Sequence, residues 1–182
     1  IDAAQHADHG VRQAAGPDTF LLGCGMPLGS GLGLFEANRI GADVSGSWKP
    51  NWNGIYPVFE NEPNVPSARV ALQNIITRAP MHRHWWLNDP DCLLVRPDTK
   101  LTLPEVQTLA SAIALTGGSL LVSDDLPRLP ADRRRIAEVL LPAIGERAWV
   151  LDWLDAETPA RLRVDLGGPG GAWHLLGWFN WG

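Results

Sequence analysis

The chain has 182 residues, of which 45% are hydrophobic, so it can bury a real core and is not a disordered segment. Its formal charge is −5, from 15 lysines and arginines against 20 aspartates and glutamates, which excludes the basic field that binds nucleic acid non-specifically. No apolar run reaches the roughly 18 residues of a membrane-spanning helix. Residues 1–6 lack a signal-peptide pattern, but the chain does not begin with methionine, so compartment and oligomeric state are left open.

Strand-like and helical segments alternate along the first 145 residues. In chain order we predict a helix at 1–15, strands at 19–24 and 38–44, a helix at 67–78, a strand at 92–95, a helix at 102–115, a strand at 119–123 and a helix at 132–140. This alternation favours a parallel α/β sheet, with polar residues after the strands as on the functional rim of a (β/α)8 barrel. A closed barrel needs roughly 250 residues, so four strands make about half of one.

The pattern changes after Gly145. Segments at 149–151, 161–166 and 173–181 are β-like and are joined by glycine and proline turns, with no helix between them. We therefore expect two domains, a partial barrel at 1–145 and the beginning of an all-β domain at 146–182.

Arg39 and Asp43 are the first candidate site residues. Side chains of equal parity point the same way in an extended strand, so a strand at 38–44 would direct both into one pocket. Taken alone, such a pair is more often a surface ion pair of little energetic value.

Nine tryptophans are unusual for this length, and several lie in loops, namely Trp48, Trp52, Trp85 and Trp86. Indole faces at loop tips suit stacking on sugars, and we assign Trp48 to substrate binding; packing beneath loops is the alternative for each. Cys24 and Cys92 are interpreted as buried thiols. A cluster of His82, His84, Asp89 and Asp91 has no standard zinc spacing, so no metal site is predicted.

Four stretches, read together, resemble the melibiase-type α-galactosidases of glycoside hydrolase family 36 and their family 27 relatives. They are FLLGCGMPLG at 20–29, RIGADV at 39–44, WLNDPDC at 86–92 and GGSLLVSDDL at 117–126. Their order and spacing match strands five to eight of that family's barrel. The terminal FNW at 179–181 resembles the opening of its C-terminal β-sandwich.

The resemblance implies roles for individual residues. Asp43 matches the general acid/base and Arg39 matches the arginine that binds the sugar, while Cys24 matches a position beside the sugar's 2-hydroxyl. Asp89 and Asp91 match a motif whose hydrogen bonds support the loop of the seventh strand. The resemblance implies no metal or cofactor, and its partner is a carbohydrate substrate, an α-galactoside.

A retaining glycosidase uses two carboxyl groups about 5–5.5 Å apart, one as nucleophile and one as proton donor. Burial or the charge of its carboxylate partner is expected to favour the protonated form of Asp43 at the first step. The family nucleophile belongs to a Lys-x-Asp segment of strand four, which would precede Ile1. The chain by itself is therefore expected to be inactive.

Two other interpretations stay open. One is a non-catalytic carbohydrate-binding protein that uses the loop tryptophans and Arg39. The other is an inactive truncated barrel whose exposed half-sheet seeks a partner. The sequence does not choose between galactose and N-acetylgalactosamine as the terminal sugar.

Overall fold

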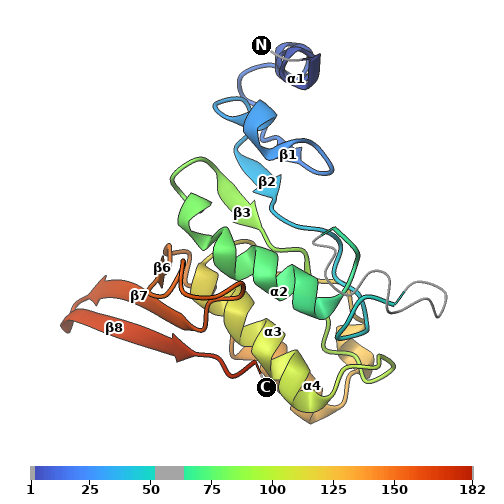
Figure 1. The fold of residues 1–182 in the computed structure, drawn as a ribbon, viewed down its shortest axis with the longest axis vertical. Coiled ribbons are helices and arrows are strands. Elements are labelled where there is room, and N and C mark those ends of the chain that lie inside the picture. Colours follow the sequence, from blue (N-terminus) through green and yellow to red (C-terminus); the bar gives the residue numbers. More distant parts are fainter. Residues whose placement is uncertain (1–2, 52–63, 182) are drawn as a thin grey trace.

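The chain forms two short parallel sheets before residue 125. The computed structural model describes residues 3–51 and 64–181. Strands β1 (Leu22–Gly23), β2 (Ala37–Arg39) and β3 (Leu87–Asp89) pair in that order, as Figure 1 shows. Strand β4 (Cys92–Leu93) pairs with β5 (Leu121–Val122). The mixed α/β architecture expected from the alternation of segments is confirmed.

Two strand predictions need correction. The strand predicted at 38–44 ends at Arg39, because β2 pairs in parallel with β3 only as far as Asp89. The segment at 87–89 was not predicted as a strand, yet it forms β3. Only Pro90 and Asp91 separate β3 from β4, and Asp91 has a φ of 75°, so the chain passes from one sheet to the other within two residues.

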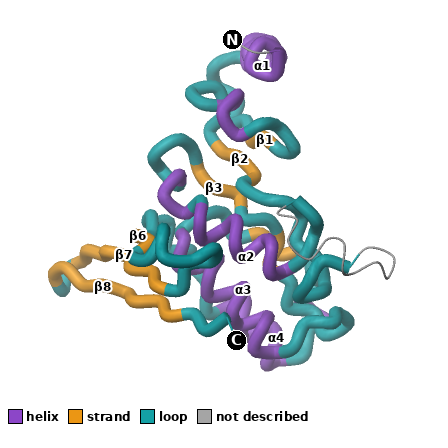
Figure 2. The backbone as a smooth tube through the Cα atoms, in the orientation of Figure 1, coloured by secondary structure: helices purple, strands orange, loops and turns teal. Residues whose placement is uncertain are grey.

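Helices α2 (Ala68–Thr77) and α3 (Leu103–Thr116) cover this sheet region and contact each other (Figure 2). The helices predicted at 67–78 and 102–115 are confirmed, and each begins at a capping residue: Ser67 Oγ accepts a hydrogen bond from Val70 N at 3.1 Å, and Thr102 and Glu105 form a capping box. Gly117, with a φ of 76°, ends α3 in the left-handed conformation that glycine allows. Helix α4 (Ala131–Glu138) follows and keeps its arginine run largely at the surface.

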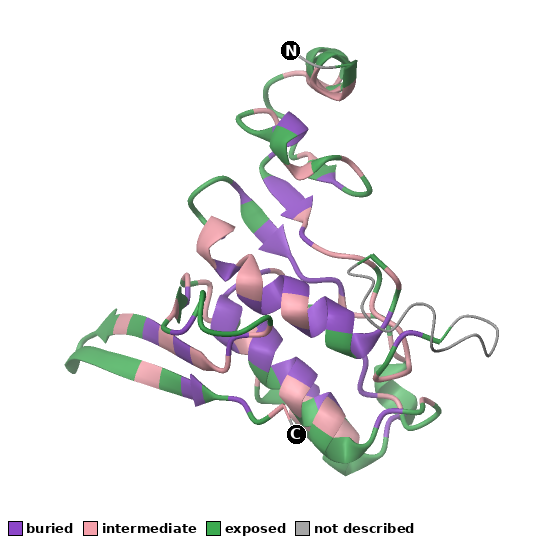
Figure 3. Ribbon diagram, in the orientation of Figure 1, coloured by how far each residue is buried: buried purple, intermediate pink, exposed green. Residues whose placement is uncertain are grey.

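The core lies between these helices and the strands. Figure 3 shows buried residues concentrated along the facing sides of α2 and α3. The largest fully buried side chains include Leu72, Ile75, Ile76, Leu93, Leu109 and Ile113. Burying each of these side chains stabilises the folded state by about 1.5–3 kcal/mol, and this burial is the main stabilisation of this part of the fold.

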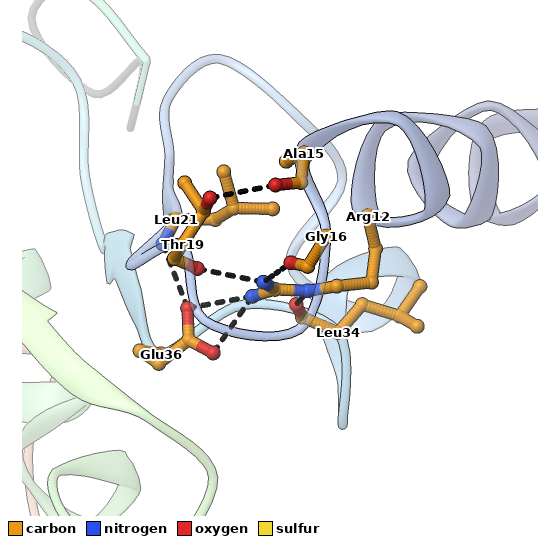
Figure 4. A network of polar contacts seen from close by, with 7 residues as sticks. All are labelled: Arg12, Ala15, Gly16, Thr19, Leu21, Leu34 and Glu36. Carbon is orange, nitrogen blue, oxygen red and sulfur yellow. Dashed lines mark hydrogen bonds and ion pairs between the residues drawn. The ribbon is translucent and has the colours of Figure 1, made fainter.

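Helix α1 (Ala3–Ala15) projects from the rest of the molecule and has no buried residue. Its attachment is polar, and Figure 4 shows it. Arg12 donates from Nε to the Leu34 carbonyl at 2.8 Å and pairs through Nη2 with Glu36 at 2.6 Å. Glu36 in turn accepts from Leu21 N at 2.7 Å, and these contacts lower the pKa of its carboxyl group, the Leu21 hydrogen bond most and then Arg12.

An antiparallel sheet completes the chain, with β6 (Trp149–Val150), β7 (Arg161–Gly168) and β8 (Gly171–Trp178) in that order. The three β-like segments predicted after residue 145 are thus strands. Leu162 and Val164 of β7 belong to the same hydrophobic cluster as α2 and α3. The two parts share a core, and the division into domains at residue 145 stays a prediction.

Within residues 3–51 and 64–181, no helix combines the length and the apolar character that crossing a lipid bilayer requires.

Candidate active site

The candidate site lies where β2 and β3 end. Arg39 is the last residue of β2 and Asp89 is the last residue of β3, and the two are partners in the parallel register. Neighbours in register project from the same face of a sheet, so their side chains meet. Arg39 Nε donates to Asp89 Oδ2 at 3.0 Å, and only 15% and 2% of the two side chains are exposed.

Asp91 adds a second buried carboxylate to this arginine. Its Oδ2 lies 3.0 Å from Arg39 Nη1, and its Oδ1 accepts from Cys92 N at 2.7 Å. The left-handed backbone of Asp91 is one that aspartate tolerates better than most residues, and Asp89 Oδ1 fixes it by accepting from Asp91 N at 2.9 Å. The break between β3 and β4 thereby places two carboxylates beside one guanidinium.

Asp43 is the exposed member of the cluster. Arg39 Nη1 donates to Asp43 Oδ1 at 3.3 Å, while 77% of the Asp43 side chain is exposed. The two residues are brought together as predicted, but not by a strand: residues 40–44 form a bend after β2. The expectation that burial would favour the protonated form of Asp43 is wrong, since the side chain faces solvent.

The bend that carries Asp43 is anchored at both ends. Arg78, which follows α2, donates to the Ile40 carbonyl, and Ile40 N donates to the Asp89 carbonyl at 3.0 Å. At the other end Val44 N donates to Asp91 Oδ2 at 2.7 Å. The sequence analysis did not predict this contact of Arg78. The helical spacing of Arg78 with the apolar positions of α2 was a signal that its side chain lies on the inner face of the helix.

The charges of the cluster do not balance. Burial lowers the pKa of Arg39, but the hydrogen bond and charge of Asp89, then the charges of Asp91 and Cys24, outweigh it and raise that pKa above its ordinary value. With both buried carboxylates ionised, one positive and two negative charges give the buried part a net charge of −1. Asp43 therefore approaches a cation that two other carboxylates already compensate.

The two cysteines lie near this cluster, and both are free. Cys24 is exposed just after β1, so its interpretation as a buried thiol is wrong; the elements described here leave that strand end uncovered. Cys92 is half-buried, and burial raises the pKa of its thiol, an effect that a hydrogen bond with Ser123 opposes. The substrate-binding role of Cys24 stays a prediction.

The tryptophans divide between packing and exposure. Trp48 is half-buried and packs against the core, so its predicted role in substrate binding stays a prediction. Trp86 is 4% exposed and donates from Nε1 to Asn88 Oδ1 at 3.1 Å, whereas Trp85 is 45% exposed. Trp52 lies outside the described residues.

Other polar residues near the strands have structural partners. His82 Nδ1 accepts from Asn88 N at 3.1 Å, and burial lowers the pKa of this imidazole. Asp124 accepts from Val95 N at 2.6 Å and from Arg96 N at 3.0 Å, and Arg96 Nη1 lies 2.8 Å from it. These contacts give Asp124 a structural role in holding the chain after β4.

No protein-family model matches the chain. Among solved structures, the α-galactosidase of Thermus thermophilus in complex with p-nitrophenyl α-D-galactopyranoside matches 88% of this chain and 31% of its own, with 27% identity and a TM-score of 0.65. The same enzyme in complex with stachyose matches 75% of this chain and 29% of its own, with 28% identity and a TM-score of 0.60.

Fold similarity extends to a more distant enzyme. α-Galactosidase I from Mortierella vinacea matches 95% of this chain and 46% of its own, with 12% identity and a TM-score of 0.59. The chain thus spans less than half the length of these structures. The similarity supports a place in the α-galactosidase superfamily and a relationship to glycoside hydrolases.

Proposed function

We propose that this chain is the C-terminal half of the catalytic barrel of a retaining α-galactosidase, about strands five to eight, followed by the start of a β-sandwich. The observation that carries the proposal is the cluster at the ends of β2 and β3, in which a buried, doubly paired arginine stands beside the exposed carboxyl group of Asp43. The similarity to α-galactosidases, one of them in complex with stachyose, supports it.

In this proposal Asp43 is the general acid/base. It protonates the leaving glycosidic oxygen in the first step and removes a proton from water in the second. Its exposure lets it reach both a substrate and water, and its ion pair with Arg39 places it beside the proposed sugar-binding residue.

Arg39 is the proposed sugar-binding residue. Its Nε and Nη1 bind carboxylates, and within the described part of the chain no hydrogen-bond partner contacts Nη2. An Nη2 amino group held rigidly in this way can donate to a sugar hydroxyl. Cys24 and Trp48 are proposed as further contacts with the sugar. The nucleophile is proposed to lie in a strand-four segment before Ile1, which makes residues 1–182 alone inactive.

The test uses the protein that comprises this chain and the barrel strands preceding it. Asp43→Ala should slow hydrolysis of stachyose by about 10²- to 10⁴-fold, the usual contribution of a general acid. Hydrolysis of p-nitrophenyl α-galactoside should slow much less, because nitrophenolate leaves without protonation. Equal losses on the two substrates would exclude the acid role.

Asp98→Ala is the matched control. Asp98 has the same 77% exposure as Asp43 and also pairs with an arginine, Arg96, at 3.2 Å, but it lies outside the Arg39 cluster. Its removal should leave the rates on both substrates unchanged.

A further inference from the structure

Asp91 contacts each of the parts that determine where Asp43 lies. Its Oδ2 accepts from Val44 N at 2.7 Å and lies 3.0 Å from Arg39 Nη1. Asp43 stands between these two residues in the chain. One carboxylate oxygen therefore binds the residue just before the bend and the residue that ends it.

The other anchors of the bend do less. Arg78 binds the Ile40 carbonyl but contacts neither Asp43 nor Val44 through any hydrogen bond among the described residues. The Asp89 side chain binds Arg39 at 3.0 Å and accepts from Asp91 N, and the Asp89 carbonyl accepts from Ile40 N, so Asp89 holds only the first end of the bend directly. Among the described residues, Asp91 is the side chain that joins the arginine to the far end of the bend.

The charge of Asp91 adds to this geometry. Asp91 is 10% exposed at its side chain, so its attraction to Arg39 is weakly screened. Without that charge, Arg39 would have only Asp89 as a buried counter-charge and would attract the exposed carboxyl group of Asp43 more strongly. The ion pair that already joins Arg39 to Asp43 at 3.3 Å would then hold that carboxyl group more firmly against the arginine and away from a leaving oxygen.

We infer that Asp91 is the positioning residue of the proposed acid/base: it fixes the bend at 40–44 and compensates Arg39, so that Asp43 points to the glycosidic oxygen. This inference rests on the proposed function. It assigns a kinetic role to Asp91 beyond the support of its own loop.

Two substitutions test it in the protein that comprises this chain and its preceding strands. Asp91→Asn keeps an acceptor oxygen and suits the left-handed backbone but removes the charge, while Asp91→Gly removes both contacts in a residue that adopts a φ of 75° freely. We expect kcat on stachyose to fall by about 10²-fold, as for a small misplacement of a reacting group, with a much smaller fall on p-nitrophenyl α-galactoside.

Asp89→Asn and Asp124→Asn are the comparison variants. Asp89→Asn removes one of the two buried counter-charges of Arg39 but leaves the hydrogen bond from Val44 N to Asp91 in place, so it should raise KM on both substrates and change the ratio of the two rates less than the Asp91 variants do. Asp124→Asn also perturbs a buried carboxylate, but the partners of Asp124 are Val95 and Arg96, which lie outside the bend. This variant should leave the ratio of the two rates unchanged.

Amide hydrogen exchange at Val44 tests the positioning role of Asp91 separately from the proposed function. Exchange should accelerate in Asp91→Gly and stay slow in Asp124→Asn, whatever the activity of the protein. Unchanged protection of Val44, or equal loss of kcat on both substrates, would overturn the role of Asp91. A wild-type protein that cleaves neither substrate would overturn the proposed function, while the exchange comparison would still decide whether Asp91 holds the bend.

Discussion

Arg39 and Arg96 each stand beside one exposed and at least one buried aspartate, and they differ in how their charges balance. Arg39 is 15% exposed and pairs with two buried carboxylates, those of Asp89 and Asp91. Arg96 is 38% exposed and pairs with a single buried carboxylate, that of Asp124. Asp43 and Asp98 are their equally exposed partners.

The difference separates a candidate active site at Arg39 from a set of structural contacts at Asp124. Asp124 accepts two backbone N–H groups, so it mainly holds the chain after β4, and the arginine beside it extends toward solvent. At Arg39 the guanidinium itself is the buried centre, and an excess of negative charge lies behind the exposed carboxyl group. The carboxyl group of Asp43 therefore lies beside a buried, doubly paired arginine, whereas that of Asp98 lies beside a solvated one.

Arg39→Ala should have the largest effect on stability. It leaves the carboxylates of Asp89 and Asp91 buried without a cation, and breaking such a pair costs about 3–5 kcal/mol. Arg96→Ala should cost much less, because Asp124 keeps its two backbone donors. Urea unfolding of both variants measures the difference, and equal losses would remove the distinction between the two clusters.

Asp124→Ala should have an intermediate effect. It leaves the N–H groups of Val95 and Arg96 without their acceptor, which lowers the free energy of unfolding by about 1–3 kcal/mol. The ratio of the rates on stachyose and p-nitrophenyl α-galactoside should stay at its wild-type value in the folded protein. A changed ratio would place Asp124 in the catalytic site and weaken the contrast with the Arg39 cluster.

Arg12→Ala should have the smallest effect on global stability. Arg12 attaches α1 through exposed polar contacts, and α1 buries no residue, so its release should lower the free energy of unfolding by about 1 kcal/mol or less. Limited proteolysis should nevertheless cut the chain sooner between α1 and β1. Resistance equal to that of the wild type would show that contacts other than those of Arg12 hold the helix.

Local signals were enough to predict much of the fold. The caps at Ser67 and Thr102 and the stop at Gly117 act within a few residues, so the positions of α2 and α3 followed from the sequence. Strand ends were harder, because the end of β2 depends on its register with β3. The hydrogen bond from Val44 to Asp91 joins residues 47 positions apart, which no local pattern contains.

The sequence predicted which residues form the site better than it predicted how they are arranged. The pairing of Arg39 with Asp43 was expected, but from the alternation of a strand rather than from a bend held by Asp91. The exposure of Asp43 and Cys24 was missed, since exposure depends on which distant elements cover a strand end. The contact between Arg39 and Asp89 follows from parallel register and was visible only once β3 was recognised.

The pH dependence of kcat/KM on stachyose, whose leaving group needs the proton, tests the central claim most directly, in the protein that comprises this chain and its preceding strands. The wild type should give a bell-shaped profile, rising as the nucleophile ionises and falling as the acid loses its proton. Asp43→Ala should abolish the fall at high pH and keep the rise at low pH, while Asp98→Ala should keep both limbs. A profile for Asp43→Ala with both limbs intact would contradict the assignment of Asp43 as the proton donor.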